Sequence, residues 1–137
     1  MTTTPPAEEN AQDDYLVDYG ITTANRNQRG LTYTTAPLPA DLEVTGDPVV
    51  HLYAASTATD NDFFAYLEDV APDGSTRYFA VDGSLRASNR ALHQPPYDNW
   101  GLPYHRSFEK DAQLLMPGKP VALSFNMGST SYIFKAG

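Results

Sequence analysis

The sequence contains no cysteine, which excludes disulfide bonds, thiolate zinc sites and cysteine nucleophiles while leaving the redox compartment open. It also lacks any apolar run approaching the roughly 18 residues of a transmembrane helix. The N-terminus has neither the basic start nor the apolar stretch of a secretory signal. We therefore expect a soluble, cytoplasmic protein with no membrane-spanning segment.

Basic residues are scarce. Nine lysines and arginines stand against seventeen aspartates and glutamates, so the formal net charge is −8. A surface of that sign repels the phosphate backbone of nucleic acids and anionic lipid headgroups. The composition therefore argues against nucleic acid and membrane surfaces as partners.

Length and composition indicate one domain built from short elements. A chain of 137 residues buries roughly two thirds of its unfolded surface on folding, which is enough for one core. Eleven prolines and nine glycines indicate frequent turns. Residues 1–14 are polar, acidic and proline-bearing, which is typical of a disordered tail or linker. We expect a single domain over residues 15–137, with a short strand or strap at residues 15–19.

Short apolar and β-branched runs predict β-structure through the rest of the chain. Residues 49–55 are apolar on both faces, which indicates a central strand. Residues 63–70 predict another strand, and Pro72-Asp73-Gly74 is a turn tripeptide that returns the chain as a hairpin over residues 75–81. The dipeptide Asp82-Gly83 is expected to end that strand. Further strand signals lie at residues 31–35, 85–90, 112–115, 121–125 and 132–134.

The segment Ala91–Phe108 interrupts this pattern. It contains three prolines, a glycine and the chain's one tryptophan, so it predicts a long, aromatic-rich loop. The remaining segments amount to about eight or nine short strands, with no amphipathic helix, which predicts an all-β sandwich or barrel.

Residues that could carry chemistry form no convincing constellation. The Gly-x-Ser-x-Gly elbow of α/β-hydrolases is absent, and Ser84 and Ser129, which follow glycines, are interpreted as turn serines. His51, His93 and His105 lack metal-ligand spacing, and Asp60-Asn61-Asp62 is interpreted as a loop cap rather than a calcium site. The arginines at positions 77, 86, 90 and 106 are expected to be solvated or paired with acids. We expect no catalytic residue, metal or cofactor in this chain.

The most informative run is Phe63-Phe64-Ala65-Tyr66-Leu67. If alternate residues fill the core, the geometry of a strand turns Phe64 and Tyr66 outward. Two aromatic side chains on the same face of a strand would be exposed in an isolated domain. We expect either the loop of residues 91–108 or a partner domain to cover them. The predicted partner contacts are the aromatic side chains of these two regions, namely Phe64, Tyr66, Tyr97, Trp100 and Tyr104.

The order of motifs resembles a known family. It is similar to the C-terminal jelly-roll domain, of galactose-binding-like type, of X-prolyl dipeptidyl-peptidases and cocaine-esterase-like serine hydrolases. The matching pieces form an ordered series over about residues 15–137: Leu31–Leu38, Asp41–Gly46, Ala54–Phe63, Leu67–Gly74, Asp82–Ser88 and Thr130–Gly137.

This resemblance implies a jelly-roll β-sandwich that packs on an α/β-hydrolase domain and shapes its cleft. The catalytic serine, aspartate and histidine of such enzymes lie on that other domain. In the family this domain is part of the same polypeptide, and for a separate chain it would be part of another polypeptide. Family members cleave X-prolyl dipeptides or varied acyl and amide bonds, so the resemblance does not fix a substrate. Members also continue into further strands where this sequence stops after Phe134–Gly137, so we expect a domain that lacks its final strands and exposes an edge that favours aggregation or association. A homo-oligomer that uses the Phe64 and Tyr66 face is a separate hypothesis.

A free-standing carbohydrate-binding module is the alternative. Jelly rolls commonly bind sugars, and Tyr97, Trp100 and Tyr104 are suited to stacking against them.

Overall fold

A computed structural model of the protein describes residues 30–137, apart from the side chains of residues 76–80. The tail expected at residues 1–14 and the strap expected at 15–19 lie outside the described residues. The chain divides into two units, residues 1–35 and 36–137, and every strand below belongs to the second. The described part is all-β and antiparallel, with six strands and two short 3-10 helices. Within it, no helix has the length and apolar character needed to cross a membrane.

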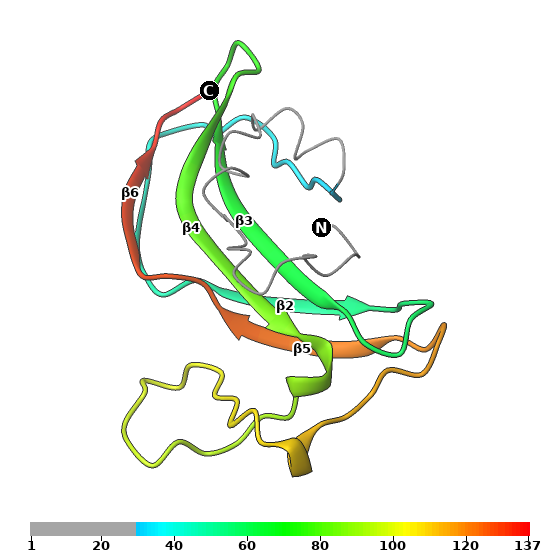
Figure 1. Ribbon diagram of the computed structural model, residues 1–137. Helices are drawn as coiled ribbons and strands as arrows, with labels where there is room; N and C mark the ends of the chain where they lie inside the picture. The colour runs from blue at the N-terminus through cyan, green and yellow to red at the C-terminus, as the bar shows by residue number, and fades with distance from the viewer. Residues whose placement is uncertain (1–29) are drawn as a thin grey trace, which may run out of the picture. The chain divides into compact units, whose positions relative to one another are not determined.

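Four of the strands form one long antiparallel ribbon with a bend (Figure 1). Strand β1 (Leu42–Gly46) pairs with β6 (Thr130–Phe134), and β2 (Val49–Ala54) pairs with β5 (Val121–Asn126). Only Asp47 and Pro48 separate β1 from β2, so both ladders are made by the same two chain segments. The proline fits this interruption because it has no N–H to donate to a ladder.

The bend is held by one hydrogen bond within the ribbon and one to a third segment, residues 82–83. The Met127 N–H donates to the Pro48 carbonyl (2.8 Å) and the Gly128 N–H donates to the Asp82 carbonyl (3.1 Å). Gly83 lies in the crook, where a Cβ atom would stand 2.7 Å from the Asn126 carbonyl oxygen. Glycine therefore lets the neighbouring strand approach the ribbon's backbone.

That neighbouring strand belongs to the β3–β4 hairpin. Strands β3 (Asp62–Val70) and β4 (Thr76–Arg86) are antiparallel, with a register shift between Leu67 and Glu68. The turn that joins them has Gly74 at φ 80°, and the Asp73 carboxylate accepts the Ser75 N–H at 2.8 Å. The sequence prediction of this hairpin and its turn is confirmed.

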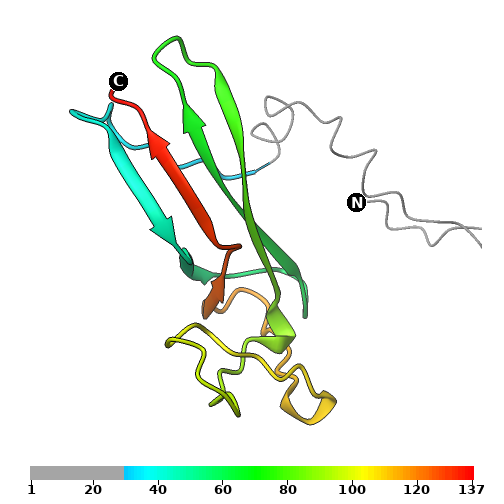
Figure 2. The same ribbon diagram turned by 90° about the vertical axis from the view of Figure 1, so that its left-hand side faces the viewer.

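The core lies between the hairpin and the β2–β5 ladder. Buried Leu85, Ala87, Leu115, Leu123 and Phe125 form its centre. Alternate residues of β2, β3 and β5 pack against that centre, as the strand period of two requires; they are Val50, Leu52, Ala54, Phe63, Ala65 and Val121. At the other end of the ribbon the Tyr132 hydroxyl donates to the Asp69 carboxylate of β3 at 2.7 Å. Figure 2 shows the green hairpin next to the β1–β6 part of the ribbon.

Two strand predictions were wrong. Residues 31–35 form no strand, because a β-prone run without a partner ladder among the described residues gains nothing from its propensity. Residues 112–115 form none either, since the Gln113 and Leu115 N–H groups donate to carbonyls of Ser88 and Thr59 instead. With these two removed, the described residues hold six strands rather than eight or nine.

Two further predictions were wrong, one about where a strand ends and one about whether a strand is central in its sheet. Asp82-Gly83 does not end a strand, because β4 continues through it to Arg86, and Ser84 is accordingly a strand residue rather than a turn serine. Strand β2 is not buried on both faces: Val50 and Leu52 pack inward, whereas His51 and Tyr53 are exposed. Among the described residues its one ladder partner is β5.

Candidate docking surface

The segment Ala91–Phe108 is a loop without strand or helix, as predicted, and it extends from the end of the sandwich next to β5 (Figure 1). We call it the aromatic loop. His105 fastens it: one ring nitrogen, Nε2, lies 2.8 Å from the Ser124 carbonyl of β5 and the other, Nδ1, lies 3.2 Å from the Ala91 carbonyl. The His93 N–H donates to the Tyr104 carbonyl at 3.0 Å. The loop therefore has a fixed base on the sandwich.

At its tip the loop makes a tight turn, Asn99-Trp100-Gly101-Leu102. The Leu102 N–H donates to the Asn99 carbonyl at 3.1 Å. Trp100 has φ 56° and Gly101 has φ 77°, so both central residues are left-handed, as a type I′ turn requires. Glycine adopts this conformation freely, but tryptophan does not.

Two polar side chains brace the turn. The Asp98 carboxylate accepts the Trp100 N–H at 3.0 Å, and the Asn99 side-chain amide donates to the Leu102 carbonyl at 2.7 Å. Below them the rings of Tyr97 and Tyr104 meet edge to face, with centroids 5.9 Å apart. These contacts hold the backbone at the tip while leaving the Trp100 side chain 83% exposed.

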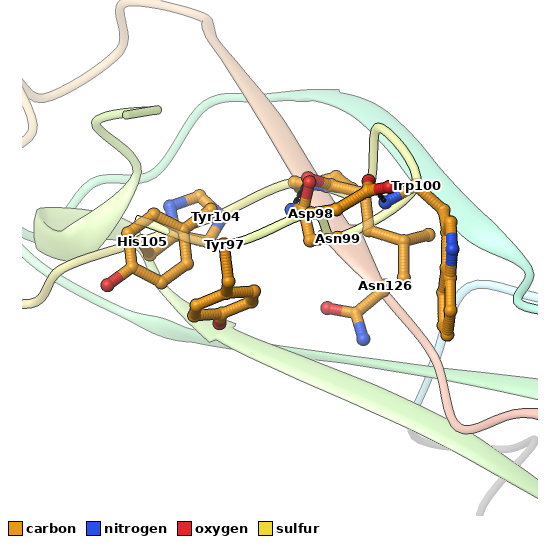
Figure 3. Close-up of a pocket in the computed structure, with 9 residues that line it drawn as sticks. Tyr97, Asp98, Asn99, Trp100, Tyr104, His105 and Asn126 are labelled. Carbon is orange, nitrogen blue, oxygen red and sulfur yellow. Dashed lines mark hydrogen bonds between the residues drawn. The ribbon is translucent and has the colours of Figure 1, made fainter. Parts of the chain in front are cut away.

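A shallow hollow lies beneath the turn. Figure 3 shows Tyr97, Tyr104 and His105 at one end of it, Trp100 at the other, and Asn126 of β5 between them. Its volume is about 450 Å³. Three of the five predicted contact residues, Tyr97, Trp100 and Tyr104, line this one hollow.

The other two lie on a separate face. Phe64 and Tyr66 point away from the core on β3, 46% and 39% exposed, as the alternation predicts. The aromatic loop packs along β2 and β5 instead, where His51 and Ser124 line a second hollow with it. The structure therefore divides the five predicted residues between two surfaces.

An ion pair supports the far side of the loop. The Arg106 guanidinium donates to both carboxylate oxygens of Asp111, at 3.0 and 2.7 Å, and His93 Nε2 lies 3.6 Å from the same carboxylate. The hydrogen bond from Arg106 lowers the pKa of Asp111 below the ordinary value of 3.8. The pair joins the end of the loop to the 3-10 helix Glu109–Asp111.

Several other residues considered for chemistry have structural partners, whereas the side chain of Arg77 lies outside the described part of the structure. Ser129 donates to the Asp47 carboxylate at the ribbon's bend. The Asp60 carboxylate accepts the N–H groups of Asn61 and Ser88, so the interpretation as a loop cap is confirmed. Arg86 pairs with Asp62, and the hydrogen bond with Arg86 lowers the pKa of that carboxyl.

The described residues include a serine–histidine pair. Ser124 Oγ lies 3.0 Å from His51 Nδ1, and the two residues are opposite each other in the β2–β5 register. Within residues 30–137 no hydrogen bond joins His51 to an acid, whereas nucleophilic catalysis by serine needs a base that a third group orients. The same residues hold no group of three or more histidines and acids placed for a metal. The pair is therefore a cross-strand contact.

Sequence reasoning missed part of this surface. Among the described residues, the two non-glycine positions with positive φ, Trp100 and Ser107, both lie in the aromatic loop. Gly101 was the available signal for the turn, since glycine favours left-handed positions. The contribution of Asn126 had no local signal, because it depends on how β5 meets the loop.

Comparison with known proteins places the chain. The family model of the X-Pro dipeptidyl-peptidase C-terminal non-catalytic domain matches residues 1–137. Two relatives named as putative serine esterases, from Mycobacterium bovis and Mycobacterium tuberculosis, are each 47% identical to this chain over 109 residues. The match covers 78% of this chain but 17% of each relative, so the chain spans about a sixth of their length. No solved structure gives a significant match. The chain belongs to the family of X-Pro dipeptidyl-peptidase C-terminal non-catalytic domains.

Proposed function

We propose that this chain is the accessory domain of an esterase-type serine hydrolase, and that it packs on the α/β-hydrolase domain of that enzyme and shapes the entrance to its cleft. The observation that carries the proposal is the aromatic loop, a braced segment that presents large apolar side chains outside the core. The family to which the chain belongs is non-catalytic by description, which supports a role in positioning rather than in chemistry.

The partner is proposed to lie in the same polypeptide. The matched segment is 17% of each mycobacterial relative, so most of a related protein lies outside it and has room for a catalytic domain. Domains within a chain meet through interfaces of moderate size that combine apolar and polar groups. A loop with aromatic residues and hydrogen-bonding side chains fits an interface of that kind.

Esters are the proposed substrate class, because the relatives are named for esterase activity. In this arrangement the serine, histidine and acid of the catalytic domain carry out acyl transfer. The accessory domain limits which substrates reach them. X-prolyl dipeptides, which the family name suggests, are the second class to test.

A fusion protein tests the proposal. This chain replaces the matched segment of the Mycobacterium tuberculosis relative, and hydrolysis of p-nitrophenyl esters and of an aminoacyl-proline anilide is compared with the intact relative and with a version in which the segment is deleted. We expect the isolated chain and the deletion to be inactive and the fusion to recover ester hydrolysis. Turnover by the isolated chain that a serine-directed inhibitor abolishes would refute the non-catalytic role.

A further inference from the structure

Trp100 combines two unfavourable features at one position. A left-handed backbone costs a residue with a Cβ atom free energy that glycine avoids. Its indole, 83% exposed, gains little from burial in this chain. Neither feature contributes to the stability of the fold, so the fold alone does not explain a tryptophan here.

The turn nevertheless holds this residue in one place. The Asp98 carboxylate accepts the Trp100 N–H, the Asn99 side-chain amide donates to the Leu102 carbonyl, and the Tyr97–Tyr104 contact lies beneath the turn. A residue whose backbone is fixed in this way loses less conformational entropy on binding than one in a mobile loop, so preorganisation of the turn increases affinity. Tryptophan is also among the residues most enriched at the energetic centres of interfaces.

We propose that Trp100 is the anchor of the interdomain contact, inserting its indole into an apolar pocket on the catalytic domain of the same polypeptide. This inference rests on the proposed function and narrows it to one residue. The partner is inferred from the relatives, because in them the matched segment is joined to a much longer remainder of the same polypeptide. Phe64 and Tyr66 are less suitable anchors, because they are more than half buried and lie on a regular strand.

The polar groups around Trp100 favour a protein partner over a sugar. A sugar site pairs a stacking ring with side chains that have free hydrogen-bonding capacity for hydroxyl groups. Beside Trp100, however, an oxygen of Asp98 and the amide nitrogen of Asn99 already bond to the turn's own backbone. The indole is the most exposed of the large apolar side chains in the aromatic loop.

The test compares Trp100→Gly in the isolated chain and in the fusion with the mycobacterial catalytic part. Glycine suits the left-handed position, so the isolated variant should melt at a higher temperature than the unsubstituted chain. In the fusion, hydrogen exchange at the Leu102 amide should show protection beyond that in the isolated chain, and Trp100→Gly should lower this extra protection by about thirtyfold or more, as the loss of a central interface residue does. Trp100→Phe should retain part of it.

The controls separate the alternatives. Phe64→Ser combined with Tyr66→Ser removes the other aromatic pair and should leave the protection at Leu102 unchanged. Equal protection in the Trp100→Gly fusion and the unsubstituted fusion, with ester hydrolysis intact, overturns the anchor while the proposed function stands. An unsubstituted fusion without ester hydrolysis overturns both. Calorimetric binding of an oligosaccharide by the isolated chain, lost in Trp100→Gly, reassigns the loop to sugar binding and also overturns the anchor.

Discussion

The packed faces of β2 and β5 and the aromatic loop both carry large apolar side chains, but they use them in opposite ways. In the strands, alternation turns Leu123 and Phe125 into the core on regular backbone, and Leu123 is only 1% exposed. In the loop, Trp100 is exposed on a left-handed backbone that other side chains brace. The packed strands stabilise the fold, whereas the loop exposes an aromatic surface and loses some free energy of folding to do so. Substitutions in the two regions should therefore differ in sign as well as size.

The largest effect is expected in the core. Leu123→Ala should lower the free energy of unfolding by about 2–5 kcal/mol, because it removes buried methyl groups and leaves a cavity. Urea denaturation of the isolated chain measures this. On the opposite face of the same ladder Tyr53→Ala should change stability by less than about 0.5 kcal/mol. Equal effects at the two positions would remove the distinction between a packed and an exposed face.

The bend of the ribbon should be nearly as sensitive. Gly83→Ala places a Cβ atom 2.7 Å from the Asn126 carbonyl oxygen and 3.1 Å from the Met127 Cα, both in the backbone. Backbone atoms cannot rotate aside, so we expect a loss of about 1–3 kcal/mol. Thermal unfolding checks it, with exposed Ser84→Ala as the neighbouring control. A neutral Gly83→Ala would show that β4 and the ribbon are not in close contact.

The loop should respond in the other direction. Trp100→Gly relieves the left-handed strain and should raise the free energy of unfolding of the isolated chain by about 1 kcal/mol, although the greater freedom of glycine when unfolded offsets part of this. Trp100→Ala keeps the strain and should bring no gain. A lower melting temperature for the glycine variant would mean that the indole supports the fold, and the contrast between the two regions would fail.

The smallest effect concerns acid stability. Because Arg106 lowers the pKa of Asp111 in the folded state, the unfolded chain binds this proton more readily. The pair therefore contributes stability above the ordinary aspartate pKa of 3.8, and that contribution disappears as the pH falls through the lowered folded value. The stability difference between the unsubstituted chain and Asp111→Asn should shrink as the pH is taken from 6 towards 2 in denaturant titrations. Glu109→Gln, in the same 3-10 helix, should show no comparable trend.

The sequence predicted what local signals determine. Pro72-Asp73-Gly74 gives its turn through its own backbone preferences, and the proline-rich composition of residues 91–108 excludes a regular element. Alternation likewise predicted that Phe64 and Tyr66 face outward. The family resemblance, found from the order of the motifs, is confirmed by the family model.

Non-local packing decided the features that were missed. Strand β1 has only two apolar residues in alternation, Leu42 and Val44, and its ladder depends on a segment near the other end of the sequence. Gly83 resembled a turn glycine because the strand that approaches it is remote in sequence. The tip of the aromatic loop was recognised as a loop, but composition does not specify the hydrogen bonds that hold its left-handed tryptophan, from the Trp100 N–H to Asp98 and from the Asn99 side chain to the Leu102 carbonyl.

The bent ribbon also constrains the order in which the protein acquires structure. Its ladders join residues far apart in sequence, from Ala54 with Val121 to Leu42 with Phe134, separations of 121 − 54 = 67 and 134 − 42 = 92 positions. The hairpin between them closes a turn of a few residues and is available much earlier. During synthesis, therefore, the segments of β1 and β2 have no ladder partner until those of β5 and β6 leave the ribosome. Until then the hairpin is the one element that can cover the apolar face of β2.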